Sequence, residues 1–88
     1  METRVAIIGI IVENPAQVSA LNAILHEYSR YIIGRMGIPY HEKGISIISV
    51  AVDAQQPEIS ALSGKIGRLE GISAKAAYSN VITKADPL

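Results

Sequence analysis

The chain contains no cysteine, tryptophan or phenylalanine, and four tyrosines are its only aromatic residues. Without cysteine it forms no disulfide, holds no thiolate-bound metal and has no cysteine nucleophile. Eight lysine and arginine residues balance eight aspartate and glutamate residues, so the formal net charge at pH 7 is zero. Nucleic-acid binding depends mainly on neutralising phosphates, and membrane-surface helices are typically basic. The balanced charge therefore argues against direct binding to nucleic acid or to a membrane.

Long hydrophobic runs are also missing. The longest apolar run, Val5–Val12, contains a glycine and is far shorter than the ~20 residues that a membrane helix needs. The N-terminus lacks the basic segment, apolar core and cleavage site of a signal peptide. We therefore expect a soluble, cytoplasmic protein. Its 88 residues suit one domain, yet 49% are hydrophobic and only 18% are charged. That is more apolar material than one small core usually holds.

The sequence pattern predicts four strands and two helices. Arg4–Val12 and Ile45–Asp53 are short and rich in β-branched residues. Both would be apolar on both faces, which is typical of central strands covered on both sides. Tyr31–Ile38, interrupted by two glycines, suits a sheet edge with a bulge, and Ile72–Ser79 alternates like a half-buried strand. Helical spacing of apolar residues predicts helices over Pro15–Tyr28, with Asn14 as N-cap, and from Gln56 to about Leu69, with Gly71 as a stop.

The order strand–helix–strand–strand–helix–strand is that of a ferredoxin-like α+β plait, βαββαβ. A weak internal repeat supports it, since Ile48 follows Ile7, and Ile59 follows Val18, at the same distance along the chain. We expect one domain over residues 1–80 and a loose tail over 81–88. In this plait both helices cover one face of an antiparallel sheet. The other face would be apolar and bare, which predicts a homodimer or homotetramer formed through the sheet face, the sheet edges, or both.

Two groups of polar residues are candidates for a binding site. Glu13 and Asn14 follow the first strand, and Arg35, His41 and Lys43 lie in or next to the turn Pro39–Gly44. An arginine can clamp a carboxylate or phosphate, and loops often carry function. The alternative is that these residues have no binding role and form a solvated turn with a structural glycine–proline pair. No nucleophile, base and orienting group can be assembled, so we expect no enzyme.

Other sites common on this fold are disfavoured. RNA-binding members stack bases on aromatic residues of the central strands, and the two central strands here contain none. No spacing supplies the three or four ligands of a metal centre, so we expect no cofactor. His41 pairing across a symmetry axis remains an alternative, as a metal-sensing or metal-handling module with interface histidines.

The sequence also resembles a known family over Arg4–Ser79. The resemblance is carried most specifically by GRMGIP, residues 34–39, and by ALSGKIG, residues 61–67. The sequence resembles the small ACT-like proteins called iron-only hydrogenase system putative regulators. The resemblance implies an ACT-like plait that self-associates and has a regulatory role near [FeFe]-hydrogenase biogenesis; it supplies no ligand or catalytic residue. ACT-like domains generally bind small effectors, often amino acids, beside the loop after the first strand. That loop often contains glycine, whereas here it is Glu13-Asn14-Pro15-Ala16, a departure that weakens the case for an amino acid.

We therefore expect a non-enzymatic regulatory domain that oligomerises and senses a small ligand or docks onto a partner protein. With no DNA-binding domain in the sequence, any effect on transcription would pass through another protein.

Overall fold

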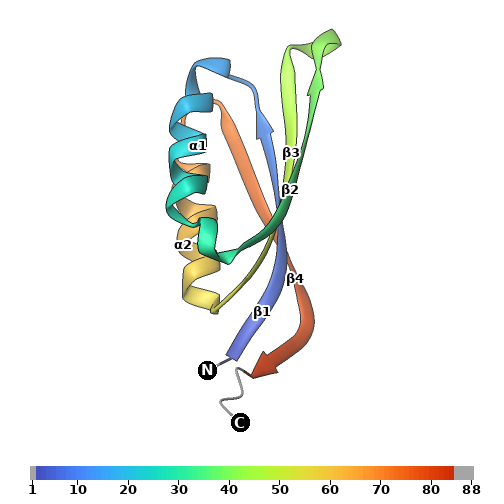
Figure 1. Cartoon of the computed structure of the whole chain (residues 1–88). Coiled ribbons are helices and arrows are strands. Elements are labelled where there is room, and N and C mark those ends of the chain that lie inside the picture. Colours follow the sequence, from blue (N-terminus) through green and yellow to red (C-terminus); the bar gives the residue numbers. More distant parts are fainter. Residues whose placement is uncertain (1, 85–88) are drawn as a thin grey trace.

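The computed structural model describes residues 2–84, which form a four-stranded antiparallel sheet with two helices on one face (Figure 1). The strands are β1 (Glu2–Val12), β2 (Ile32–Tyr40), β3 (Ile45–Ala54) and β4 (Ile72–Lys84), and the helices are α1 (Val18–Glu27) and α2 (Gln56–Gly67). Short 3₁₀ turns η1 (Pro15–Gln17), η2 (Ser29–Tyr31) and η3 (His41–Lys43) lie between them. The strand order β2-β3-β1-β4 places β1 and β3 in the centre and β2 at an edge, as expected. The chain is an α+β protein with the ferredoxin-like plait.

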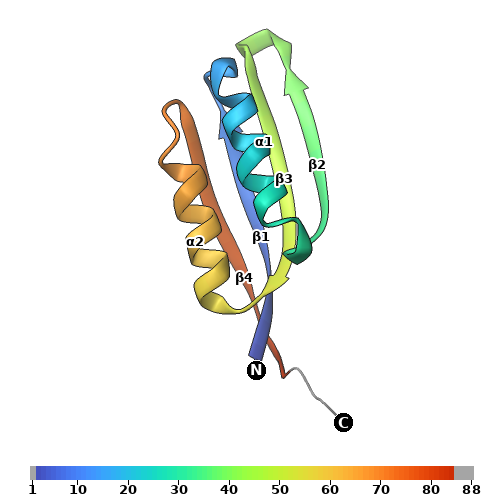
Figure 2. The same ribbon diagram turned by 60° about the vertical axis from the view of Figure 1, so that its left-hand side comes forward.

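The core lies between the sheet and the two helices, which lie side by side across it in Figure 2. Even-numbered residues of the central strands, such as Ile8, Ile10 and Val50, point towards the helices and are fully buried. Helix α1 contributes Leu21 and Leu25, and α2 contributes the buried residues Ile59, Leu62 and Ile66. The helical spacing of these apolar residues explains why both segments fold as helices with one buried stripe.

The turn from β1 into the helices depends on Asn14. Its Oδ1 accepts a hydrogen bond from the backbone N–H of Ala16 at 3.1 Å, which caps η1, and Pro15 occupies the first helical position. The expected helix from Pro15 therefore begins as one 3₁₀ turn, and regular α-helix starts only at Val18. The backbone N–H of Glu13 donates to the carbonyl of Gly71 at 2.7 Å, so this turn is tied to the start of β4.

Two further boundaries differ from the sequence-based expectation. Helix α2 ends at Gly67, and Gly71 lies in the following turn at φ +76° instead of ending the helix. Strand β2 runs to Tyr40, because Pro39 is accommodated at the sheet edge, so the hairpin turn shrinks to His41–Gly44. Gly44 adopts φ +64° there, a conformation that glycine tolerates well.

The expected tail over residues 81–88 is wrong for its first part. Strand β4 continues to Lys84, where Ile82, Thr83 and Lys84 pair with the start of β1. A register shift opposite the step from Arg4 to Ala6 lets β4 bulge and then resume pairing. Residues 85–88, the rest of that expected tail, lie outside the described residues.

Candidate functional site

Residues 2–84 leave the sheet face opposite the helices uncovered. The strand register arranges its residues in rows across β2, β3, β1 and β4. One row is Ile38–Ile47–Ile11–Ser73, the next is Met36–Ser49–Gly9–Lys75, and the third is Gly34–Ala51–Ile7–Ala77. We call this surface the open face. It presents the apolar residues of the central strands that the helices do not cover, as the sequence predicted.

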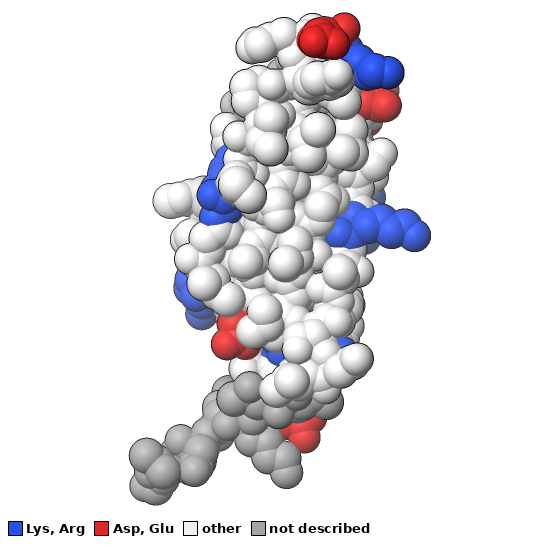
Figure 3. Space-filling model, turned by 90° about the vertical axis from the view of Figure 1, so that its right-hand side faces the viewer, with Lys and Arg blue, Asp and Glu red and all other residues white. Residues whose placement is uncertain are grey.

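Large hydrophobic side chains are exposed on the open face. Six of them are each at least 38% exposed: Val5, Ile7, Met36, Ile38, Tyr40 and Ile47. Figure 3 shows this side of the molecule as an almost uncharged expanse with Lys, Arg, Asp and Glu confined to its margins. A contiguous apolar surface of this kind marks an interaction site more often than free solvent-exposed surface.

The open face is not flat. Gly9 and Ser49 occupy the middle of their row and leave a shallow hollow of about 310 Å³, with Ile11 and Ile47 along its rim. A second, smaller hollow lies between Ile7 and Met36. The surface therefore has an isoleucine ridge, Ile38–Ile47–Ile11, beside a row with small residues at its centre, and Ile7 alone projects on the other side.

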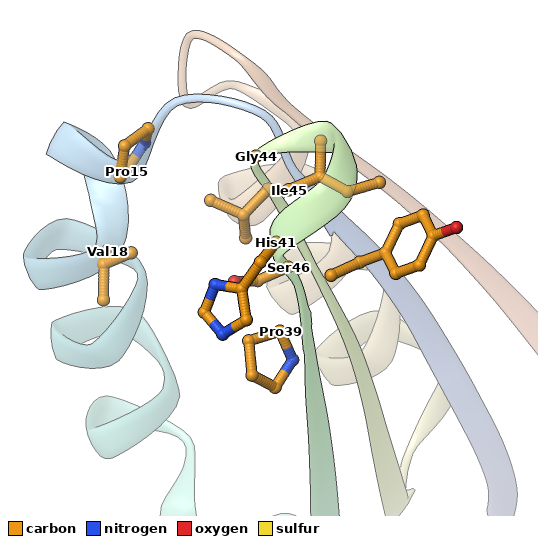
Figure 4. A pocket seen from close by; sticks show the side chains of 9 residues that line it. Pro15, Val18, Pro39, His41, Gly44, Ile45 and Ser46 are labelled. Atoms are coloured by element: carbon orange, nitrogen blue, oxygen red, sulfur yellow. The ribbon is translucent and has the colours of Figure 1, made fainter.

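A separate groove lies between the start of the helix layer and the β2–β3 hairpin (Figure 4). Its volume is about 190 Å³. Pro15 and Val18 line one side, while Pro39 and His41 line the other, and the imidazole of His41 lies between the hairpin and α1 in Figure 4. We call this the hairpin groove. It combines apolar walls with the polar groups of His41 and Ser46, as small-molecule sites usually do.

The structure divides the five candidate residues differently from the sequence-based grouping. His41 and Lys43 both lie in η3, and His41 faces the loop that contains Asn14 across the hairpin groove. Arg35 lies six positions before His41 on an extended strand, which separates the two by roughly 20 Å. Arg35 therefore belongs to a different surface.

Asn14 and Glu13 have local structural roles. The Asn14 side chain caps η1, and both backbone N–H groups donate to the carbonyl of Gly71, at 3.3 Å and 2.7 Å. The Asn14 side chain is half-buried and the Glu13 side chain is exposed.

Arg35 lines a second groove, between α1 and the edge strand β2. This α1–β2 groove has a volume of about 360 Å³. The Nη2 of Arg35 donates to Asn22 Oδ1 at 3.4 Å, and His26 and Ser29 line the groove beside them. His26 lies off the buried stripe of α1 and is exposed. Its proximity to Arg35 was missed, because only the position of the edge strand beside α1 brings them together.

One pKa is shifted on the helix layer. Glu27 accepts a hydrogen bond from Lys65 Nζ at 3.1 Å, and this bond, followed by one with Tyr28, raises the pKa of Lys65 above its usual value of 10.5. The ammonium group also lies 5.0 Å from the centre of the Tyr28 ring. The side chains of Lys65 and Glu27 are 39% and 58% exposed, so this contact joins the two helices as a surface ion pair with a small effect on stability.

Neither a cluster of metal ligands nor a membrane-spanning helix is present in the described part of the chain. Among residues 2–84, no group of three or more histidine, aspartate or glutamate side chains is close enough to hold a metal ion. Metal binding by His41 would therefore need ligands from a second copy. In the same residues, no helix is both long and apolar enough to cross a membrane.

Comparisons with known proteins assign the chain to a family. No curated protein matches its sequence. The uncharacterized protein TM1266 from Thermotoga maritima has a similar structure, with a TM-score of 0.83 and 31% sequence identity over 86% of this chain and 96% of that one. Residues 4–76 match the model of the TM1266-like family, described as "Iron-only hydrogenase system regulator, putative". This agrees with the resemblance found in the sequence, and the chain belongs to the TM1266-like family.

Proposed function

We propose that this chain is a non-enzymatic regulatory domain that works as a homo-oligomer and signals through its assembly. Two copies pack their open faces together, and ligand binding in the hairpin groove or docking of a partner protein alters that assembly. The family description supports the regulatory role. The single observation that carries self-association is the exposed apolar face opposite the helices.

The size of the open face suits a dimer. The β1–β3 ladder contains nine paired positions, so the sheet measures roughly 30 Å by 19 Å and its footprint is about 600 Å². The largest apolar patch on a typical monomer is roughly 300–600 Å², and a standard interface buries about 800 Å² per partner. The footprint of the open face thus equals the upper limit of the apolar patch area on a typical monomer. It approaches the area that one partner buries in a standard interface, even though the footprint ignores the extra area of protruding side chains.

The relief of the open face also suits a second copy of the same surface. The hollow above Gly9 and Ser49 has room for a branched aliphatic side chain, and the isoleucine row beside it supplies such side chains. In a two-fold dimer each copy provides the ridge that fills the other's hollow, which makes the surface self-complementary. Sheets that pack face to face interdigitate side chains in this way.

Sedimentation equilibrium of three variants tests the proposed dimer. Wild type is expected to sediment as a dimer or tetramer at micromolar concentration. Ile7→Glu places a charge at the centre of the open face and should give monomers, and Gly9→Leu, which fills the hollow, should weaken association. Ala61→Glu, at an exposed apolar position of α2 that lines neither groove, is the control and should associate like wild type. A monomeric wild type would contradict the proposal.

The hairpin groove is the proposed effector site. Its volume of about 190 Å³ suits a small metabolite, and the hairpin supplies its polar groups opposite the apolar Pro15 and Val18. Thermal stabilisation by a member of an amino acid and nucleotide library should disappear in Val18→Trp, which fills the groove, and persist in Arg35→Gln. Stabilisation that survives Val18→Trp would place the effector elsewhere.

A metal-handling module using His41 from two copies is the alternative. It is favoured only by the position of His41 at an exposed tip, where a second copy can approach. Native mass spectrometry of protein purified without chelator distinguishes the two proposals. Bound metal that is lost in His41→Ala would favour the metal module, and its absence together with an effector response would favour the regulatory domain as proposed above.

A further inference from the structure

None of the strands that the structure describes pairs with the outer edge of β2. All residues of β2 after Ile32 are exposed. Pro39 lies opposite Ser46 of β3, and a proline is tolerated in an edge strand where its missing N–H would face solvent. Because backbone groups alternate in direction along a strand, the N–H and C=O groups of Arg35 and Gly37 also point outwards. This edge therefore offers two donors and three acceptors to an added strand.

Side chains leave this edge accessible. Gly34 and Gly37 have no side chain to shield the backbone, and a Cβ added at Gly34 would meet no atom within 4 Å. The usual protection of an edge by several charged side chains is missing, because Arg35 is the one charged residue of β2. Its guanidinium leans away from the edge backbone towards Asn22 on α1.

The α1–β2 groove beside this edge favours negative charge. Arg35 and His26 are its titratable lining residues, and Asn22 and Ser29 add an amide and a hydroxyl. No aspartate or glutamate lines the groove, and Leu25 and Ile32 supply apolar contacts. Four of the five guanidinium N–H groups of Arg35 remain for a bound carboxylate, which arginine can hold in a two-pronged arrangement.

We propose that β2 binds an extended segment of a partner protein by strand addition, with an acidic side chain of that segment held by Arg35 in the α1–β2 groove. Peptide recognition at a sheet edge takes affinity from the backbone hydrogen bonds and specificity from pockets for alternate side chains. The charge complementarity of the groove selects an acidic segment over a neutral or basic one. This partner site is separate from the open face and from the hairpin groove.

The register predicts the sequence pattern of the partner segment. Residues directly opposite each other on neighbouring strands point to the same side of a sheet. The residue opposite Arg35 therefore faces the α1–β2 groove and is aspartate or glutamate. Its two neighbours lie opposite Gly34 and Met36, on the side of the open face, and are apolar. The pattern is apolar–acidic–apolar in an extended segment without proline.

Fluorescence anisotropy with a labelled synthetic peptide tests this proposal. The probe is KTVTVEVTVK, and the matched control peptide replaces its glutamate by glutamine. Binding of the probe to the wild-type protein is expected to exceed that of the control peptide by about fivefold, the upper end for an exposed ion pair. Arg35→Gln should remove this difference, whereas Arg68→Gln, on the exposed side of α2, should leave it unchanged.

Charge reversal and amide NMR complete the test. Arg35→Glu should reject the probe and accept a peptide with lysine in place of glutamate. In ¹⁵N spectra, the amides of Arg35 and Gly37 should shift with those of Asn22 and His26. Absence of binding, equal binding of the two peptides, or shifts confined to β4 or the open face would overturn the proposal. Pairing of β2 with β2 of a second copy, seen as contacts between differently labelled subunits, would overturn it as well.

Discussion

Gly71 is the residue where a side chain is least tolerated. It has φ +76°, and a Cβ added to it would lie 2.5 Å from the Cβ of Asn14 and 3.3 Å from the Asn14 backbone nitrogen. The carbonyl of Gly71 accepts the hydrogen bonds that hold the turn after β1. One glycine therefore joins the start of the helix layer to the start of β4.

We expect Gly71→Ala to lower the free energy of unfolding by about 2–3 kcal/mol, because it adds left-handed strain and a steric clash. Urea denaturation followed by circular dichroism measures this change. Gly67→Ala is the matched control, since Gly67 lies at the end of α2 with open space around it. That variant should be neutral or more stable by up to about 1 kcal/mol. Equal effects of the two substitutions would contradict the assigned role of Gly71.

The role of Gly71 could be predicted only in part from the sequence. Because glycine is common after helices, the sequence predicted Gly71 as the helix stop, but α2 ends at Gly67 and Gly71 lies in the turn that follows. Its contact with Asn14 joins residues far apart in the chain, and no local pattern encodes such a contact. The same holds for the contact between Arg35 and Asn22, which joins the edge strand to α1.

At the level of elements, Arg4 holds β4 where it bulges. Its Nη2 donates to the carbonyl of Ser79 at 2.7 Å, and its guanidinium lies 4.9 Å from the centre of the Tyr78 ring. Nη1 donates to Gln56 Oε1 at 3.2 Å, which connects the sheet to α2. The side chain thus joins β1, β4 and α2 at the end of the sheet away from the hairpin.

We expect Arg4→Ala to lower the free energy of unfolding by roughly 1–2 kcal/mol, through the lost hydrogen bond and ring contact. Amide hydrogen exchange should accelerate at residues 79–84 and stay unchanged in β3. Arg30→Ala is the control, because the exposed Arg30 has one ring contact, with Tyr31 at 5.5 Å, and within residues 2–84 no hydrogen bond from its side chain to another strand or helix. The free energy of unfolding of the Arg30→Ala variant is expected to change by about 0.5 kcal/mol or less. Uniform acceleration across the sheet would argue against a local role for Arg4.

Elements with a strong hydrophobic period were predicted best. The two central strands and both buried helix stripes follow from apolar spacing, and the edge position of β2 follows from the two glycines within it. The extension of β4 was missed, because Asn80 and the polar residues around it interrupt the alternation that indicates a strand. Pairing with Glu2–Arg4 keeps that segment extended, and such pairing becomes visible only when both ends of the chain are placed.

For the whole molecule, assembly should contribute to stability. A ligand that binds only the folded state stabilises it, and in a homodimer each copy is such a ligand for the other. The melting temperature of the wild type is therefore expected to rise with protein concentration. The melting temperature of Ile7→Glu should not depend on protein concentration, since its glutamate prevents the open faces from packing together. Differential scanning calorimetry over a hundredfold concentration range measures both. A concentration-independent wild type would contradict assembly through this face.

Glu2 and Lys84 are cross-strand partners, so the two described ends of the chain lie on neighbouring strands about 5 Å apart. The polypeptide therefore comes close to a closed ring, and its starting point is nearly arbitrary with respect to the fold. A short linker across these ends would leave every strand pair intact, and new ends at Glu42 and Lys43 would open the rim of the hairpin groove. Circular permutation could thus place a reporter beside the proposed effector site without interrupting either layer of the protein.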